Sequence, residues 1–360
     1  MRRISNALPV IITLIVAAAS VFLWDTESLI SAMGAVEDSS FSEEVSGEND
    51  AADITDTASD TSENSSEKQE NESETSKGTS TEASSNNASV EASTTGQAAG
   101  KIIEQFISPY NAKYSYNNVY MKNTSGININ LATELKAKLG FKIKKSSEPQ
   151  VLIVHTHATE CYMNEKRDYY TSTDAARTTN NSKNVTHIGE IVAAKLKNAG
   201  IGVLHDKTQH DHPVYTGSYS RAEVTIKEYL KKYPSIKIVL DIHRDSISSG
   251  ESDRIRPVAE INGKRAAQVM LCMGSQSGTV KNHPNWRENF RLAAKFQQTM
   301  EVMYPGLARP MVLASKLYNQ NLTTGSLLLE VGTDSNLLSE AEYSASLVGD
   351  ALVGLLNTLG

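Results

Sequence analysis

Apolar positions in the second half of this chain follow two alternating patterns. Short runs rich in Val, Ile and Leu predict strands over 151–154, 201–204, 236–240, 266–273, 311–314 and 326–331. Between them, apolar residues spaced three or four apart predict amphipathic helices over 185–198, 221–232, 286–303 and about 339–356. This alternation is typical of an α/β fold with a mostly parallel central sheet flanked by helices. Ligands bind such sheets at the carboxyl ends of the strands, so functional residues are expected there.

The N-terminal pattern is different, because it is one continuous apolar stretch. It runs from Ala7 to Trp24 after Arg2 and Arg3, and roughly 18 residues at about 1.5 Å each just cross a bilayer core. The arginines are expected to keep its start in the cytoplasm. A cleaved signal peptide is the alternative, since the stretch contains a run of small residues. We favour an uncleaved transmembrane anchor over 1–24, with the rest of the chain outside the cytoplasm, because apolar residues continue past that run.

Composition changes sharply after the anchor. Residues 25–100 are rich in Ser, Thr, Glu, Asp and Asn, with hardly any large apolar side chain after Phe41. Such sequence cannot bury enough apolar surface to offset the entropy lost on ordering, so we predict a disordered acidic tether. The tether carries the acidic excess behind the formal net charge of −7. The acidic pI therefore says little about partners of the folded part.

The remaining sequence divides into a lead-in segment over 101–149 and a domain over 150–360. The lead-in segment contains several tyrosines and short apolar runs, and we expect it to form a small subdomain or an arm that wraps the domain. The domain is long enough to bury a substantial core.

Two predicted strands end in histidines and carboxylates. His157 and Glu160 follow the strand 151–154, and His243 follows the strand 236–240. A strand end holds side chains stiffly beside an open loop. A catalytic zinc ion commonly takes two imidazoles and one carboxylate, which leaves a position open for water or substrate. We therefore predict a Zn²⁺ site formed by His157, Glu160 and His243.

Two further histidines are alternative metal ligands. His155 lies two positions before His157 and projects to the same side if the strand continues through both residues. His210 lies in the polar loop after the strand 201–204 and can replace Glu160 as the middle ligand. That loop is alternatively a solvated polar segment, and a single histidine is alternatively a buried hydrogen-bonding residue.

A predicted strand near the C-terminus places another carboxylate at the same edge of the sheet. Glu330 follows the apolar run 327–329. A carboxylate beside a metal can take a proton from water and pass it to a leaving amine, so Glu330 is the candidate general base. The alternative is a structural role, such as pairing with an arginine.

Other charged residues near these strand ends are candidates for supporting roles. Asp241 and Asp245 flank His243 and are expected to orient its other ring nitrogen, unless they only cap the strand end. The candidates for binding a carboxylate of the substrate are Arg244, Arg254 and Arg256.

Several function classes are disfavoured. Cys161 and Cys272 are the only cysteines, and no Cys/His/Asn spacing supports a thiol hydrolase. A disulfide between them and two free thiols both remain open. The chain has no phosphate-binding glycine loop and no basic stripe interleaved with aromatic residues, so nucleotide and nucleic-acid binding are not expected.

A succession of motifs resembles the stage II sporulation protein P family. The motifs that carry the resemblance are 149–160, 205–208 with 210–211, 241–245, 262–264, 285–289, 318–320 and 329–332. They cover the chain from about residue 110 to the C-terminus, and the anchor and tether are also similar to that family.

The resemblance implies a cell-wall hydrolase that cuts peptidoglycan during engulfment of the forespore. Members of the family act as N-acetylmuramoyl-L-alanine amidases and cross-link endopeptidases. The implied partners are the stage II sporulation proteins D and M. The implied location is the cell membrane, with a single-pass anchor and the catalytic domain in the space between the mother-cell and forespore membranes.

The implied fold is similar to that of zinc amidases and carboxypeptidases, which hold the metal by His, Glu and His and use a late catalytic Glu. The matching positions of this chain are His157 or His155, His243 and Glu330. Relatives in the broader amidase class take the middle ligand from the start of the first helix, where this chain has 182–184, Ser-Lys-Asn. Glu160 and His210 therefore both remain open as the middle ligand.

Three functions compete at this point. The first is a zinc amidase that acts on peptidoglycan. The second is a non-catalytic wall-binding scaffold of the engulfment machinery, which has no need of stoichiometric zinc. The third is a zinc carboxypeptidase that trims wall peptides and differs from the first in the bond it cuts.

Overall fold

The computed structural model describes residues 97–360. The predicted anchor over 1–24 and nearly all of the predicted tether lie outside these residues. Within 97–360, no helix combines the length and the apolar character needed to cross a membrane.

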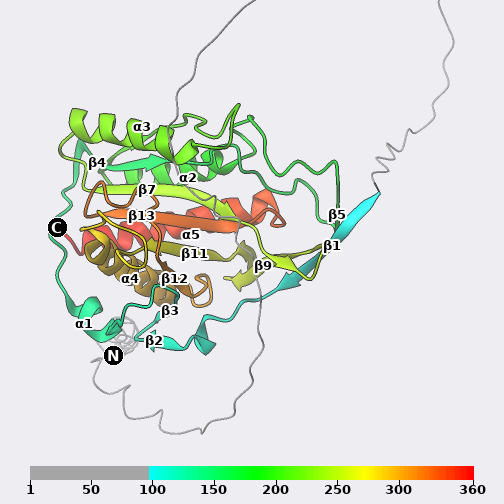
Figure 1. The fold of residues 1–360 in the computed structure, drawn as a ribbon, viewed down its shortest axis with the longest axis horizontal. Coiled ribbons are helices and arrows are strands. Elements are labelled where there is room, and N and C mark those ends of the chain that lie inside the picture. Colours follow the sequence, from blue (N-terminus) through cyan, green and yellow to red (C-terminus); the bar gives the residue numbers. More distant parts are fainter. Residues whose placement is uncertain (1–96) are drawn as a thin grey trace, which may run out of the picture. The chain divides into compact units, whose positions relative to one another are not determined.

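An eight-stranded sheet forms the centre of the fold, in the order β2-β3-β12-β11-β13-β7-β4-β6 (Figure 1). The strands are β2 (Tyr114–Tyr116), β3 (Val119–Asn123), β4 (Ser146–Val154), β6 (Ile201–His205), β7 (Ile238–Asp245), β11 (Val269–Gly274), β12 (Met311–Ala314) and β13 (Ser326–Thr333). Four neighbours, β6, β4, β7 and β13, run parallel, so their carboxyl ends share one edge of the sheet.

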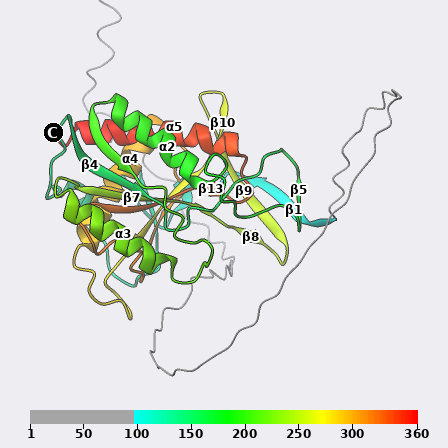
Figure 2. The same cartoon turned by 90° about the horizontal axis from the view of Figure 1, so that it is seen from above.

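Helices cover both faces of this sheet, but unequally (Figure 2). The helices are α1 (Leu131–Lys136), α2 (Val185–Asn198), α3 (Ser218–Lys232), α4 (Trp286–Met303) and α5 (Leu338–Asn357). Helices α2, α4 and α5 pack on one face and enclose the larger hydrophobic core. Helix α3 covers part of the other face and packs through Ile226 against Leu152 and Val154 of β4. The predicted α/β architecture is confirmed.

Helix α2 shows how the sequence determines where a helix begins and ends. Its buried positions include Val185, Ile188, Val192 and Leu196, which are spaced three or four residues apart. Asn184 precedes it, and the side-chain oxygen of this residue accepts a hydrogen bond from the backbone N–H of Thr186 (2.9 Å). Gly200, with a φ of 79°, follows its end. These signals explain why the helix has the predicted bounds.

The segment before residue 150 contributes to two sheets. Strands β2 and β3 extend the central sheet. A second sheet has the order β10-β9-β1-β5, with β8 paired to β9. Its strands are β1 (Ala98–Gln105), β5 (Tyr169–Thr171), β8 (Ser248–Ser249), β9 (Asp253–Ile261) and β10 (Lys264–Ala267). Both views place β1, β5 and β9 beyond the carboxyl ends of β7 and β13 (Figures 1 and 2).

The expectation of a mostly parallel sheet is wrong, because both sheets are mixed. β2 and β3 form an antiparallel hairpin whose turn residues Asn117 and Asn118 have positive φ. β11 runs antiparallel to β13. The chain leaves β7 at the carboxyl edge, forms the β9–β10 hairpin beyond that edge, and so enters β11 from the same side.

The single strand predicted over 266–273 is also wrong, because Gln268 divides it into β10 and β11. Gln268 is buried, and its side-chain amide exchanges two hydrogen bonds with the backbone of Ile107 (2.7 and 3.0 Å). These bonds hold the chain at the point where it passes from the second sheet to the central one.

Candidate metal centre

His157, Glu160 and His243 converge at the carboxyl edge of the central sheet. One ligand atom from each lies within 4.8 Å of the other two, and all three residues are buried. His157 Nδ1 lies 3.4 Å from Glu160 Oε1, and His243 Nδ1 lies 3.5 Å from Glu160 Oε2. The carboxylate therefore stands between the two imidazoles.

The chain brings these three residues together from two neighbouring strands. Strand β4 ends at Val154, and a tight turn follows in which the N–H of Glu160 donates to the carbonyl of His157 (3.1 Å). This turn places the two side chains on the same side of the loop. His243 lies within β7, which pairs in parallel with β4 and continues beyond its end.

A network of carboxylates and hydroxyls holds the cluster in place. His243 Nε2 lies 2.9 Å from Asp241 Oδ1, although the ring N–H does not point at that oxygen and the contact is one of charge. Asp241 also accepts hydrogen bonds from the backbone N–H and the hydroxyl of Thr156 (2.8 and 2.6 Å). Asp245 is not part of this network, because it pairs with Arg309 (2.9 Å).

The charges in the cluster stabilise one another. Burial favours neutral Glu160, yet the close contacts with His157 and His243 and the charge of Arg244 hold the pKa of the Glu160 carboxyl well below its usual range. Burial likewise opposes protonation of His243, but Asp241 and Glu160 raise the pKa of that imidazole well above its usual range. In the metal-free chain, the carboxylates around His243 thus favour a positive charge, which the proton on its imidazole supplies.

Glu330 lies beside this cluster on β13. In the parallel pairing of β13 with β7, Glu330 is the register partner of His243. Its Oε2 atom is shielded from solvent and has no hydrogen-bond partner among residues 97–360. Burial raises the pKa of Glu330 to about 8, and the nearby carboxylates Asp245 and Glu160 act in the same direction.

The two alternative histidines lie elsewhere. Because β4 ends at Val154, His155 does not continue the strand toward His157 as expected. His155 Nε2 lies 2.8 Å from His205 Nε2, and this imidazole pair packs under α2. His210 makes hydrogen-bond contacts with the carbonyl of His155 (3.1 Å) and the hydroxyl of Thr225 (2.9 Å). The structure thus brings Glu160 to the cluster and not His155 or His210.

The arginines predicted to bind a substrate carboxylate are largely occupied. Arg244 and Arg256 are buried and donate to backbone carbonyls. Arg254 pairs with Asp334 (3.2 Å). None of these guanidinium groups contacts the three clustered residues.

Sequence reasoning missed Arg177, whose guanidinium does contact the cluster. Its Nη2 lies 3.7 Å from Glu160 Oε1, and its Nη1 donates to Asp211 Oδ2 (2.7 Å). The guanidinium also covers the ring of Tyr215, which stacks on His157 at a centroid distance of 4.7 Å. Arg177 lies in a loop without periodicity or a strand-end motif, so no sequence signal marked it.

Both cysteines are free thiols and buried. Burial raises the pKa of each thiol, which disfavours the reactive thiolate. This finding agrees with the exclusion of a thiol hydrolase.

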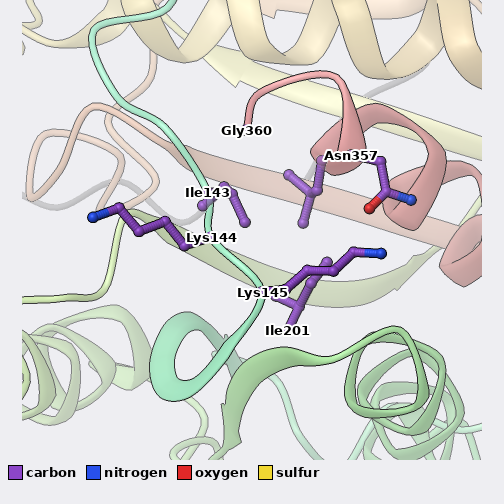
Figure 3. A pocket seen from close by; sticks show the side chains of 7 residues that line it. Ile143, Lys144, Lys145, Ile201, Asn357 and Gly360 are labelled. Atoms are coloured by element: carbon purple, nitrogen blue, oxygen red, sulfur yellow. The ribbon is translucent and has the colours of Figure 1, made fainter.

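A separate hollow of about 310 Å³ lies at the opposite edge of the sheet, where β6 begins (Figure 3). Figure 3 shows the side chains of Lys144 and Lys145 pointing in different directions. Its lining contains neither an imidazole nor a carboxylate side chain. The hollow therefore lacks the kinds of side chain that form the candidate metal centre.

The fold and the cluster define an α/β protein with a buried candidate metal centre at the ends of parallel strands. The family model described as "Stage II sporulation protein P (SpoIIP)" matches residues 21–353, and the chain belongs to that family. Stage II sporulation protein P of Bacillus subtilis (strain 168) is 31% identical to it over 211 residues. This match covers 56% of the chain and 49% of the relative, so the chain spans about half the length of that relative.

Solved structures with a remote likeness include two amidases and a metallo-carboxypeptidase. AmiC2, an N-acetylmuramoyl-L-alanine amidase of Nostoc punctiforme, has 12% identity and a TM-score of 0.35, covering 59% of this chain and 97% of that one. The CwlD amidase from Clostridioides difficile, solved with the GerS lipoprotein, has 11% identity and a TM-score of 0.37, covering 58% and 99%. A metallo-carboxypeptidase from Burkholderia cenocepacia has 10% identity and a TM-score of 0.33, covering 59% and 58%. At these scores we interpret the site from its own geometry.

Proposed function

We propose that this protein is a zinc-dependent peptidoglycan hydrolase that cleaves the amide between N-acetylmuramic acid and L-alanine. The observation that carries the proposal is the buried convergence of His157, Glu160 and His243 in a member of the stage II sporulation protein P family. Peptide cross-links between stems contain the same kind of bond, and we include them as further substrates.

The residues of the cluster fit a zinc ion. Two imidazoles and one carboxylate are a common ligand set for catalytic zinc. A carboxylate at the other ring nitrogen of a ligand is also usual, and Asp241 lies there beside His243. When bound, zinc would polarise the amide carbonyl and make water a better nucleophile.

Glu330 is the residue that would move the proton. Its Oε2 is buried beside the cluster without a hydrogen-bond partner among residues 97–360, so it is available to accept a proton. A positive charge at the neighbouring cluster favours the ionised carboxyl. Glu330 can then take a proton from water and deliver it to the nitrogen of the leaving amine.

The setting of the reaction is also part of the proposal. We place the catalytic domain outside the cytoplasm on a single-pass anchor and an acidic tether, acting during engulfment of the forespore. Family membership supports this setting and supports the stage II sporulation proteins D and M as partners.

Digestion of purified sacculi by the full-length protein tests the proposal. Mass spectrometry of the products should find stem peptides with a free amino group on L-alanine and glycan strands of unchanged length. A wall-binding scaffold would give no product, and a carboxypeptidase would release single amino acids.

Glu330→Gln should reduce this digestion by roughly 10²–10⁴-fold, the usual contribution of a positioned general base. Zinc should remain bound, because the glutamine keeps the size of the side chain and the cluster is intact. Loss of zinc from the variant would make Glu330 a ligand, and undiminished digestion would remove it from the reaction.

A further inference from the structure

One edge of the Arg177 guanidinium is firmly anchored. Its Nη1 donates to Asp211 Oδ2 (2.7 Å), and the side chain of Asp211 is fully buried. Asp211 is itself held by the backbone N–H and the hydroxyl of Thr159, at 3.2 and 2.6 Å. Thr159 lies in the turn that positions the candidate ligands His157 and Glu160, so the anchor is tied to that turn.

The orientation of the guanidinium plane is also restrained. Its Cζ atom lies 4.5 Å from the ring centroid of Tyr215. The Tyr215 ring stacks in turn on His157, with an angle of 30° between the ring planes. A guanidinium stacks well on an aromatic face and loses little freedom when it then forms hydrogen bonds. The stack holds Arg177 against the cluster.

The other edge of the guanidinium is available. Its Nη2 lies 3.7 Å from Glu160 Oε1, which is too long for a hydrogen bond. Within residues 97–360, the side chain of Arg177 makes only the hydrogen bond to Asp211. The side chain is 37% exposed, in contrast to the buried Arg244 and Arg256. Arg177 therefore presents unused N–H donors to solvent beside the cluster.

The carboxylates around the cluster make such a cation favourable for binding an anionic substrate. Glu160 and Asp241 lie at the cluster and repel a carboxylate, which would offset the attraction of a bound zinc ion. A guanidinium matches a carboxylate with two parallel hydrogen bonds, and its positive charge offsets this repulsion.

We infer that Arg177 is a specificity residue that binds a free carboxylate of the peptide stem; the inference rests on the proposed peptidoglycan hydrolase function. Because Nη2 lies 3.7 Å from Glu160, a carboxylate on the guanidinium lies only a few ångströms further from the cluster. An extended peptide covers about 3.5 Å per residue. The carboxylate therefore belongs to the residue that follows the alanine at the cleaved amide.

Two soluble muramyl tripeptides that differ only at the α-carboxyl of the second stem residue provide the test. This group is a free acid in one tripeptide and an amide in the other. Binding is measured by calorimetry with full-length protein in detergent and zinc-containing buffer, in a Glu330→Gln background so that the ligands are not consumed. We expect Arg177→Gln to weaken binding of the acid by roughly 10- to 100-fold and to leave the weaker binding of the amide unchanged. Arg177→Lys should be intermediate, because it keeps the charge but loses the planar fork.

Arg167→Gln is the matched control. Arg167 also pairs with an aspartate, Asp174, and lies over a tyrosine ring, Tyr169, but it contacts none of the three candidate ligands. This variant should bind both tripeptides like the background.

Two results would overturn the inference. If Arg177→Gln weakens both tripeptides equally, the residue only holds its loop. If the background protein binds the acid and the amide with equal affinity, it does not recognise the carboxylate. This result does not depend on whether a variant of Arg177 folds. Failure of the proposed function would give a different result. Protein with Glu330 intact would leave sacculi uncut, while the binding assay would still distinguish the acid from the amide.

Discussion

Glu330 should make the metal-free protein less stable as the pH rises. Burial raises the pKa of this carboxyl to about 8, against an ordinary value of 4.5. Between these two values the folded chain holds a proton that the unfolded chain has lost. The stabilising contribution of that proton is therefore complete below about pH 4.5 and is lost as the pH rises through about 8.

The size of this effect follows from the two pKa values. A tenfold change in proton affinity is worth about 1.4 kcal/mol, so a difference of about 3.5 sets a ceiling of about 5 kcal/mol on the loss of unfolding free energy. Glu330 is partly exposed as a residue, although its Oε2 is shielded. Solvent screening then reduces the expected loss to roughly 2–3 kcal/mol.

Denaturant unfolding of the chelator-treated full-length protein at about pH 5 and about pH 9 measures this loss. Glu330→Gln cannot ionise, so the loss of stability between the two pH values should be smaller by roughly 2–3 kcal/mol in the variant. Glu251→Gln, at an exposed glutamate, should behave like the unmodified protein. Equal losses in the unmodified protein and in Glu330→Gln would refute the reasoning, because Glu330 would then ionise as easily in the folded chain as in the unfolded one.

Three further predictions concern the ligands, the helix over them and the tether. Elemental analysis should show that His157→Ala and His243→Ala lose zinc and that His210→Ala retains it. Loss of zinc from His210→Ala would instead identify His210, and not Glu160, as the middle ligand. Gly189→Ala should lower the unfolding free energy by about 1–3 kcal/mol, because a Cβ there would lie 2.7 Å from each imidazole of the pair under α2; unchanged denaturant midpoints would contradict this. Deleting part of 40–90 should leave digestion of free sacculi unchanged but impair wall digestion in cells, and equal impairment in both assays would show that the segment is not a spacer.

Local signals explain which elements of the fold could be predicted from the sequence. Helices α2 and α4 have the predicted bounds, because their periodicity lies within the segments and their stop signals, Gly200 and Pro305, lie two residues beyond their ends. The division of the strand at Gln268 could not be predicted, because it depends on a contact with Ile107, 161 residues away. The second sheet also depends on such distant pairings, as between β1 and β9.

The same distinction applies to the candidate site. His157 and Glu160 are three residues apart, and they and His243 follow predicted strands, so a shared site could be expected if those strands run parallel. The choice between His155 and His157 depends on where β4 ends, and only the structure shows that it ends at Val154. Arg177 reaches the cluster through an isolated bridge between its backbone and that of Glu160, and no periodicity in either segment predicts such a bridge.

Titration of zinc into chelator-treated full-length protein tests the central claim most directly, if bound zinc and digestion of sacculi are measured on the same samples. We predict that digestion is lost on chelation, returns in proportion to bound zinc and reaches a plateau at about one zinc per chain, and that His243→Ala neither binds the ion nor recovers activity. Full digestion by the zinc-free protein, or recovery in His243→Ala, would contradict the account.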